Sequence, residues 1–152
     1  MVLLSAGAWC AVVVCTPLLA AHDGNAASFG YRVLSFVCHQ DPRRSFELAG
    51  HPMAACIRCT SIYLAFFAGA LLAPALARRL PQSTTGLWCL ATLPMLVDVA
   101  LDILGWHMST TPTRVFTGGL FGIISGVILT PLLIEALRER WNSRNPTLEN
   151  CR

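Results

Sequence analysis

The chain contains four long stretches in which apolar residues follow one another almost without charge. They cover residues 2–21, 60–77, 86–106 and 115–134, and within them only the third carries charged residues. A helix rises 1.5 Å per residue, so roughly 20 apolar residues are needed to cross the hydrocarbon core of a membrane. The sequence therefore predicts an all-α fold, an integral membrane bundle of about four transmembrane helices.

The composition supports this reading. Hydrophobic residues make up 55% of the 152 residues and charged residues only 12%, well below the roughly 25% typical of soluble domains. The surplus of apolar side chains must face lipid, so we expect a single membrane domain, residues 1–152, in an inner or plasma membrane. All 11 basic residues are arginines spread along the chain, which does not favour nucleic-acid binding. The polar tail, residues 142–152, is expected to fray.

The first apolar stretch has two interpretations. Residues 2–21 are followed by His22, Asp23, Gly24 and Asn25, so the segment also resembles a signal peptide that ends in small residues. A signal peptide normally begins with basic residues, and this one has none. Its length matches a complete span. We therefore favour a retained transmembrane helix.

The connection between the first and second spans is long, covering residues 22–59. A long loop in a compact protein is usually functional or disordered. Within it, Phe29, Val33 and Phe36 are spaced like one face of a helix. We expect a short interfacial helix over residues 28–37.

Small residues recur at four-residue intervals in two of the spans. In lipid they let helix backbones approach closely, because packing replaces the hydrophobic drive for association. We therefore expect close helix contacts along both series. They are Ala65, Gly69 and Ala73 in the second span, and Gly118, Gly122 and Gly126 in the fourth.

Reactive and charged side chains converge on one end of the expected bundle. The second and fourth spans begin on the side where the third span ends, and the long loop lies on that side too. Topology alone therefore gathers the candidate site residues. They are Cys38, His39, Arg44, Cys56, Arg58, Cys59, Asp98, Asp102 and Arg114.

Asp98 and Asp102 lie within the third span, four residues apart and so on one helix face. An ionised carboxylate there costs roughly 2.5–3.5 kcal/mol on insertion scales, so it normally has a partner or a function. For Asp102, which is close to the helix end, an ion pair with Arg114 or Arg58 that fixes the helix register is an equal alternative. For the deeper Asp98 we favour a catalytic role.

Cys56 and Cys59 form a CxxC motif, with Cys38 and His39 a short loop upstream. Zinc is bound tetrahedrally by thiolates and imidazoles, so these four residues are a candidate metal site. Four ligands would make a structural site, whereas three would leave the open position of a catalytic one. CxxC is also a redox pair, for which Cys38 could resolve a mixed disulfide. We favour the metal, because a redox pair needs neither the histidine nor the aspartates.

The arginines at this end are candidates for binding an anion. Arg58 and Arg114 would act in catalysis beside the aspartates, and Arg44 would bind an anionic group of the substrate. Tyr63 lies one turn after Cys59 and could also contact the substrate. The alternative for Tyr63 is an ordinary interior aromatic residue.

Two of these motifs are spaced as in a known family. Residues 38–46 read Cys-His-Gln-Asp-Pro-Arg-Arg-Ser-Phe, and residues 56–63 read Cys-Ile-Arg-Cys-Thr-Ser-Ile-Tyr. This pattern resembles domain-of-unknown-function family 2085, a family of predicted membrane proteins, although Ser61 stands where the family usually has glycine. A looser likeness continues through Pro94 to Gly122. The resemblance brings no activity with it and implies a shared core of Cys38, His39, Arg44, Cys56, Arg58, Cys59, Tyr63, Asp98 and Arg114.

The arginines give only a weak signal for membrane orientation, because each end of the bundle has several. If Arg44, Arg58 and Arg114 serve the site, they should be discounted. The positive-inside rule then places the opposite end in the cytoplasm and the site outside. The arginines of that opposite end are Arg78, Arg79, Arg138, Arg140, Arg144 and Arg152.

The leading functional hypothesis is a membrane-embedded, zinc-dependent hydrolase acting on a lipid or another amphiphilic small molecule. Asp98 or Asp102 would position or deprotonate the attacking water. A quinone-linked thiol–disulfide oxidoreductase is the second hypothesis. The third is a proton- or cation-coupled transporter, or a scaffold stapled by metal. The sequence leaves the oligomeric state open, a homo-oligomer included.

Overall fold

A computed structural model of the chain describes residues 1–76, 84–106 and 109–144. These residues form five α-helices: α1 (Val2–Ala20), α2 (Gly24–Ser35), α3 (Ile57–Leu76), α4 (Thr84–Ile103) and α5 (Thr111–Arg144). A short 3-10 turn, η1 (Pro42–Arg44), leads into two strands, β1 (Ser45–Leu48) and β2 (His51–Cys56). The helices α1, α3, α4 and α5 are long and apolar enough to cross a membrane. The expected helical membrane bundle is confirmed, with one small hairpin added.

The largest difference from the expected spans is in α5. This helix has 34 residues, begins at Thr111 and continues to Arg144, beyond the apolar stretch. Residues 142–144, which we expected to fray, are its last helical residues. The rest of the predicted tail and residue 77 of the second predicted span lie outside the described residues.

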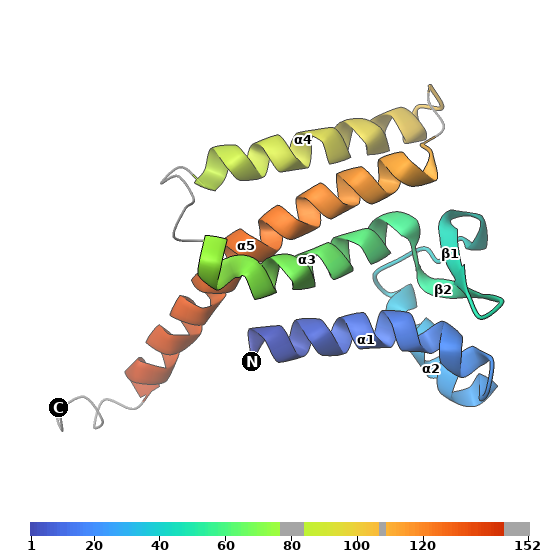
Figure 1. Cartoon of the computed structure of the whole chain (residues 1–152), viewed down its shortest axis with the longest axis horizontal. Coiled ribbons are helices and arrows are strands. Elements are labelled where there is room, and N and C mark those ends of the chain that lie inside the picture. Colours follow the sequence, from blue (N-terminus) through green and yellow to red (C-terminus); the bar gives the residue numbers. More distant parts are fainter. Residues whose placement is uncertain (77–83, 107–108, 145–152) are drawn as a thin grey trace.

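The four long helices lie side by side in the order α4, α5, α3, α1 (Figure 1). In this arrangement α5 lies between α3 and α4. The helices α3 and α5 begin at the end of the bundle where α1 and α4 finish. One end of each long helix therefore lies there beside the long loop, as the sequence predicts, and this loop contains the hairpin and α2.

The contact between α3 and α5 is the closest in the bundle, and it uses the predicted small residues. A Cβ atom added at Gly126 would collide with the carbonyl oxygen of Phe66, and one added at Gly122 would collide with that of Ile62. Gly69 of α3 faces the backbone of Ile123 in the same way. Only glycine permits such an approach, so these residues fix how the two helices pack.

The long loop contains α2, which begins four residues earlier than predicted. Asp23 precedes it, and its side chain accepts a hydrogen bond from the backbone N–H of Asn25 at 3.0 Å, which caps the helix. The face buried against the protein is made of Ala27, Gly30 and Leu34. The predicted apolar face points outward, with Phe29 and Phe36 exposed, as expected of a helix at a membrane interface.

The antiparallel hairpin β1–β2 was not predicted. Leu48 pairs with His51, and the two residues between them, Ala49 and Gly50, have positive φ angles of 54° and 78°. Two-residue hairpin turns favour this left-handed backbone, because its twist matches that of the strands. The hairpin rests on α1 and α2, and Tyr31 of α2 donates a hydrogen bond to the Pro52 carbonyl at 2.6 Å.

A compact core lies under the hairpin. Its buried members come from α1, α2, β2 and the segment between α2 and η1. This core holds β2 in place directly before α3 begins, and so positions the residues at that junction. The core consists of Val13, Leu34, Cys38, Met53, Ala54 and Ala55.

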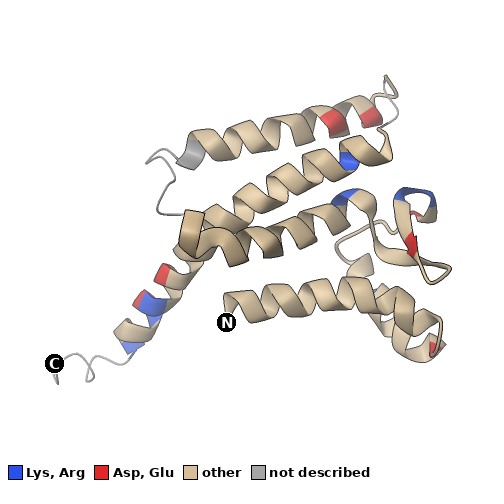
Figure 2. Cartoon of the chain, in the orientation of Figure 1, with Lys and Arg blue, Asp and Glu red and all other residues tan. Residues whose placement is uncertain are grey.

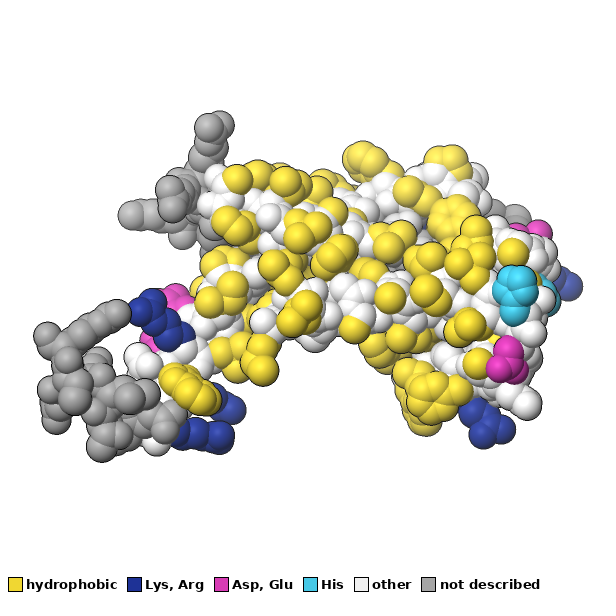
Figure 3. All heavy atoms as spheres, turned by 60° about the horizontal axis from the view of Figure 1, so that its bottom comes forward, with side chains coloured by type: hydrophobic (Ala, Val, Ile, Leu, Met, Phe, Trp, Pro, Cys, Tyr) yellow, Lys and Arg dark blue, Asp and Glu magenta, His cyan; other side chains and the backbone are white. Residues whose placement is uncertain are grey.

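Charged residues gather at the two ends of the molecule (Figure 2). The body of the bundle between them carries no charge in the described residues. Hydrophobic side chains cover most of its visible length (Figure 3). This distribution is the one a membrane requires, because apolar surface faces lipid and charge stays at the interfaces.

Candidate functional site

Three of the four predicted metal ligands lie together at the hairpin end of the bundle. The sulfur atoms of Cys38, Cys56 and Cys59 are all within 4.8 Å of one another. Cys38 follows α2, Cys56 is the last residue of β2, and Cys59 lies in the first turn of α3. Zinc binds each thiolate at about 2.3 Å, so sulfurs at this spacing can converge on one ion.

The three thiols are also linked by hydrogen bonds. The backbone N–H of Cys56 donates to the Cys38 sulfur at 3.1 Å. A hydrogen bond from the Cys59 thiol is the main cause that lowers the pKa of Cys56 to about 5, against the opposing effect of burial. Cys56 is therefore a thiolate at neutral pH, which is the form that binds metal or attacks a disulfide.

His39 does not belong to this group of ligand atoms. Instead it lines a neighbouring cavity of about 160 Å³. Cys56 lines the same cavity, so one wall of the cavity borders the thiol group. The complete lining is His39, Asp41, Arg44, Cys56, Arg58 and Arg114.

Asp98 is buried and bound to Arg58 by an ion pair. The Ser109 hydroxyl donates a hydrogen bond to Oδ1 of Asp98 at 2.8 Å. The Thr117 hydroxyl of α5 lies 3.5 Å from Oδ2, the oxygen that Arg58 binds. Arg58 also donates to the Ser109 hydroxyl at 3.2 Å. Asp98 lies on α4 and Arg58 lies on α3, so this ion pair joins the two helices that flank α5.

Asp102 joins the two remaining arginines. Arg44 of η1 donates to it at 3.1 Å, and Arg114 of α5 lies 3.4 Å from both carboxylate oxygens. Neither Asp102 nor Asp98 is among the residues that line the cavity. The predicted convergence is therefore present in a specific form, in which the arginines stand between the aspartates and the thiols.

The arginines of the cavity are incompletely satisfied. In the described part of the chain, the Nε atoms of Arg58 and Arg114 are buried without a hydrogen-bond partner. The contacts between Arg114 and Asp102 are near the outer limit of hydrogen bonding. A small anion in the cavity would give these guanidinium groups the acceptor that the protein itself supplies only in part.

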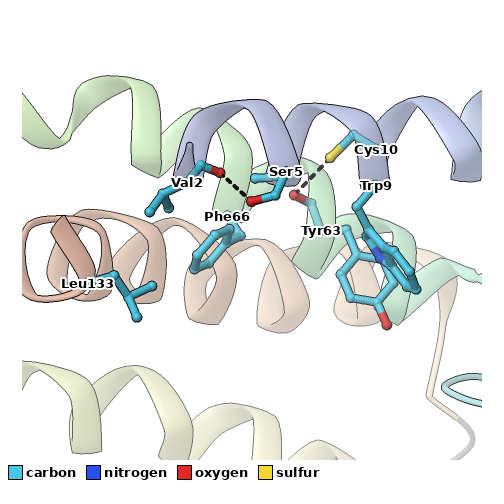
Figure 4. A pocket seen from close by; sticks show the side chains of 8 residues that line it. Val2, Ser5, Trp9, Cys10, Tyr63, Phe66 and Leu133 are labelled. Atoms are coloured by element: carbon cyan, nitrogen blue, oxygen red, sulfur yellow. Dashed lines mark hydrogen bonds between the residues drawn. The ribbon is translucent and has the colours of Figure 1, made fainter. Parts of the chain in front are cut away.

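Tyr63 lies outside the arginine cavity. It lines a separate groove between α1 and α3, where its ring meets Trp9 edge to face (Figure 4). Its ring also packs against the hydrophobic core that contains Cys38. Tyr63 therefore lies between the groove and the core that contains Cys38.

Two structural contributions were not predicted from the sequence. Gln40 takes a positive φ angle of 50° and donates hydrogen bonds to the carbonyls of Tyr31 and Ala54 at 2.7 and 2.9 Å, which fixes the turn after Cys38. Ser109 joins Asp98 to Arg58. A glutamine beside a Cys-His pair and a serine just before a span are too common to signal either role.

Comparison with known proteins agrees with this core. The profile of domain-of-unknown-function family 2085, described as predicted membrane protein, matches residues 38–128. The chain belongs to this family. The matched region runs from Cys38 into α5. It therefore contains the three clustered cysteines, the three arginines of the cavity and both aspartates of α4.

Two uncharacterized archaeal proteins are similar to this family 2085 chain. One, from Methanocaldococcus jannaschii, is 32% identical over 113 residues, which cover 73% of this chain and 72% of that protein. Another, from Methanothermobacter thermautotrophicus, is 33% identical over 98 residues, 64% of this chain and 87% of that protein. No solved structure matches the chain.

Proposed function

We propose that this protein is a membrane-embedded, zinc-dependent hydrolase that acts on an amphiphile with an anionic head group. The observation that carries the proposal is that the thiol group and the arginine cavity share one residue. Cys56 belongs to the thiol group and also lines the cavity that presents Arg44, Arg58 and Arg114. A metal held by the thiols would therefore lie beside a cavity suited to an anion.

The three sulfurs make an incomplete tetrahedral set. Structural zinc sites normally have four protein ligands, whereas catalytic sites have three and leave one position for water or substrate. Zinc in this place would supply Lewis-acid chemistry, polarising the ester and lowering the pKa of water towards about 7. The cavity on this side gives room for the reacting group.

The protein groups divide the remaining work. Arg58 and Arg114 would bind the anionic oxygens and stabilise the negative charge that builds up during attack. Asp98 and Asp102 each bind arginine, which favours a positioning role over the proton transfer that the sequence suggests. His39 lines the cavity, and a neutral imidazole has a nitrogen that can accept a proton, so we assign it as the proton acceptor.

The reaction would be hydrolysis of a phosphate ester. The oxygen of water bonds to phosphorus while the bond from phosphorus to the alcohol oxygen breaks. One proton of the water passes to His39, which then gives this proton to the departing alcohol oxygen, so that alcohol and phosphate are released. No oxidant, reductant or second substrate is needed.

The proposal is tested with zinc-loaded protein in vesicles of phosphatidylcholine containing phosphatidic acid or phosphatidylglycerol. We expect release of phosphate or head group, loss of this release on chelation, and recovery when zinc is added back. Cys56→Ser should abolish hydrolysis, whereas Cys15→Ser, an exposed cysteine of α1 outside the thiol group, should leave it unchanged. No hydrolysis of either anionic lipid by the zinc-loaded protein would reject the proposal.

One observation favours a second function, a quinone-linked thiol–disulfide oxidoreductase. The three thiols are close enough to exchange partners, and the low pKa of Cys56 favours attack on a disulfide. Mass spectrometry of protein quenched with acid distinguishes the two. A Cys56–Cys59 disulfide whose amount follows added quinone would favour the redox function, whereas zinc-protected thiols that resist alkylation would exclude it.

We also propose that the site faces the outside of the cell from an inner or plasma membrane. Arg44, Arg58 and Arg114 have partners in the site, so they say little about topology. The arginines at the far end of α5, Arg138, Arg140 and Arg144, are exposed. By the positive-inside rule that end belongs in the cytoplasm.

A further inference from the structure

A groove opens between α1 and α3, with Tyr63 in its wall (Figure 4). Its volume is about 310 Å³. Because α1 and α3 are both long enough to span a membrane, most of the groove lies at the depth of the hydrocarbon chains. The lining residues are Val2, Ser5, Ala6, Trp9, Cys10, Tyr63, Phe66 and Leu133.

Two polar groups in this groove, the Ser5 hydroxyl and the Cys10 thiol, have their acceptors within the protein. The Ser5 hydroxyl donates to the Val2 carbonyl at 2.9 Å, and the Cys10 thiol donates to the Tyr63 carbonyl at 3.4 Å (Figure 4). The other lining side chains are aliphatic or aromatic, and only the indole N–H of Trp9 and the hydroxyl of Tyr63 are polar groups among them. Most of the wall therefore offers van der Waals contact, which suits a hydrocarbon chain.

The inner end of the groove leads to the thiols. Trp9 and Tyr63 meet there edge to face, with ring centroids 5.8 Å apart. Tyr63 lies one helical turn after Cys59, and both pack against the core that contains Cys38. The thiol group thus neighbours the apolar groove through Tyr63 and borders the arginine cavity through Cys56.

We propose that this groove binds the hydrocarbon chain of the substrate while the arginine cavity binds its anionic head. The proposal rests on the proposed function and narrows its substrate class. With the chain in the groove and the head in the cavity, and the thiols next to both, the bond that joins chain and head lies beside the metal ligands. The substrate is therefore an anionic single- or double-chain lipid cleaved at the junction of head and chain.

The test uses the full-length, zinc-loaded protein in phosphatidylcholine vesicles with photoreactive phosphatidic acid. A diazirine near the head end of the acyl chain should label Trp9 or Tyr63, and one near the chain terminus should label Val2 or Leu133. The same diazirines on phosphatidylcholine should label the groove much less, because that lipid has no net negative charge. Equal labelling by both lipids, or labelling spread evenly over the lipid-facing surface, would overturn the proposal.

A matched pair of variants sharpens the test. Ala6→Trp fills the groove, whereas Ala8→Trp adds the same side chain at an exposed position of α1 that does not line it. Ala6→Trp should reduce groove labelling about tenfold, as expected when roughly two methylene groups lose their burial. Ala8→Trp should leave labelling unchanged. Equal effects of the two variants would overturn the proposal.

Two further readouts separate this inference from the proposed function. Zinc content should be the same in Ala6→Trp, Ala8→Trp and the wild type, which shows that the site is intact. If the wild type hydrolyses anionic lipid and Ala6→Trp does so equally well, the groove assignment fails and the proposed function stands. If the groove is labelled selectively but no lipid is hydrolysed, the proposed function fails instead.

Discussion

Asp98 and Arg58 form a largely buried ion pair of the site, and each depends on the other. Asp98 accepts hydrogen bonds from Arg58 and Ser109 and is 9% exposed. Removing one charge of a buried pair leaves the other without compensation, which costs more than the pair itself contributes.

We predict that Asp98→Asn lowers the free energy of unfolding by about 3 kcal/mol. Glu139→Gln, at an exposed position of α5, should change it by less than about 0.5 kcal/mol. Denaturant titration in detergent micelles measures both. The double variant Asp98→Asn with Arg58→Gln should lose less than the sum of the single variants, and additive losses would show that the two residues are not coupled.

The lowered pKa of Cys56 predicts how its rate of alkylation depends on pH. Its pKa is lowered to about 5, so in metal-free protein it remains a thiolate at neutral pH, and its alkylation should slow only as the pH falls through about 5. The peptide-resolved rate of iodoacetamide labelling measures this. In Cys59→Ala the main stabilising hydrogen bond is gone, so the midpoint should move towards the ordinary thiol value of 9.0. A wild-type midpoint already near 9.0 would contradict the account.

At this scale the sequence predicted which residues meet, and it offered the ion pair of Asp102 with Arg114 as an alternative, which the structure contains. The pairing of Asp98 with Arg58 was not predicted. Asp98 and Asp102 lie on one helix face, and two spans that carry arginines begin at the same end of the bundle. These two facts predict that the arginines lie near the aspartates. The order of contact depends on α5 lying between α3 and α4, which no local pattern reveals. The separation of His39 from the thiols depends likewise on the backbone turn at Gln40.

The pair α3–α5 is the element that carries the site. Arg58 and Cys59 lie on α3 and Arg114 on α5, so the distance between their first turns determines the width of the arginine cavity. Gly118 has its Cβ position 2.8 Å from the Arg58 carbonyl, directly under the cavity. Close glycine packing therefore positions the charged groups as well as the helices.

Glycine substitutions in α5 test this packing. Gly126→Ala would place its methyl group against the Phe66 carbonyl, and we expect it to lower the free energy of unfolding by about 1–3 kcal/mol. Gly119→Ala is the matched control, because nothing lies within 4 Å of its added Cβ. It should be neutral or stabilising by up to about 1 kcal/mol, since alanine is the better helix former. Thermal unfolding in detergent measures both variants. Equal stabilities of the two would contradict the close packing at Gly126.

Some elements were predictable from the sequence and others were not. Long apolar runs predicted the transmembrane helices, because in lipid a single segment satisfies its backbone polar groups only as a helix. The hairpin was missed because its strands have only four and six residues, with Pro52 inside β2 and alanine in a left-handed turn position. Its stability comes from packing on α1 and α2, which is a tertiary effect.

The whole molecule has charged residues at both ends, in the site at one end and in the last turns of α5 at the other (Figure 2). The proposed orientation predicts the labelling of single cysteines added on intact cells. Ala26→Cys, exposed on α2, should react with a membrane-impermeant maleimide, whereas Ser143→Cys, exposed at the end of α5, should react only after permeabilisation. The wild-type chain supplies the background. The reverse pattern would place the site in the cytoplasm.

The account as a whole rests on a metal ion held by three sulfurs. The direct measurement is the metal content of purified, folded protein, combined with X-ray absorption at the zinc edge. We predict one zinc per chain with three sulfur neighbours at about 2.3 Å. Zinc should be lost in Cys38→Ser and Cys59→Ser and kept in Cys89→Ser, a cysteine outside the cluster. Folded wild-type protein that binds no zinc when supplied with it would contradict the central claim.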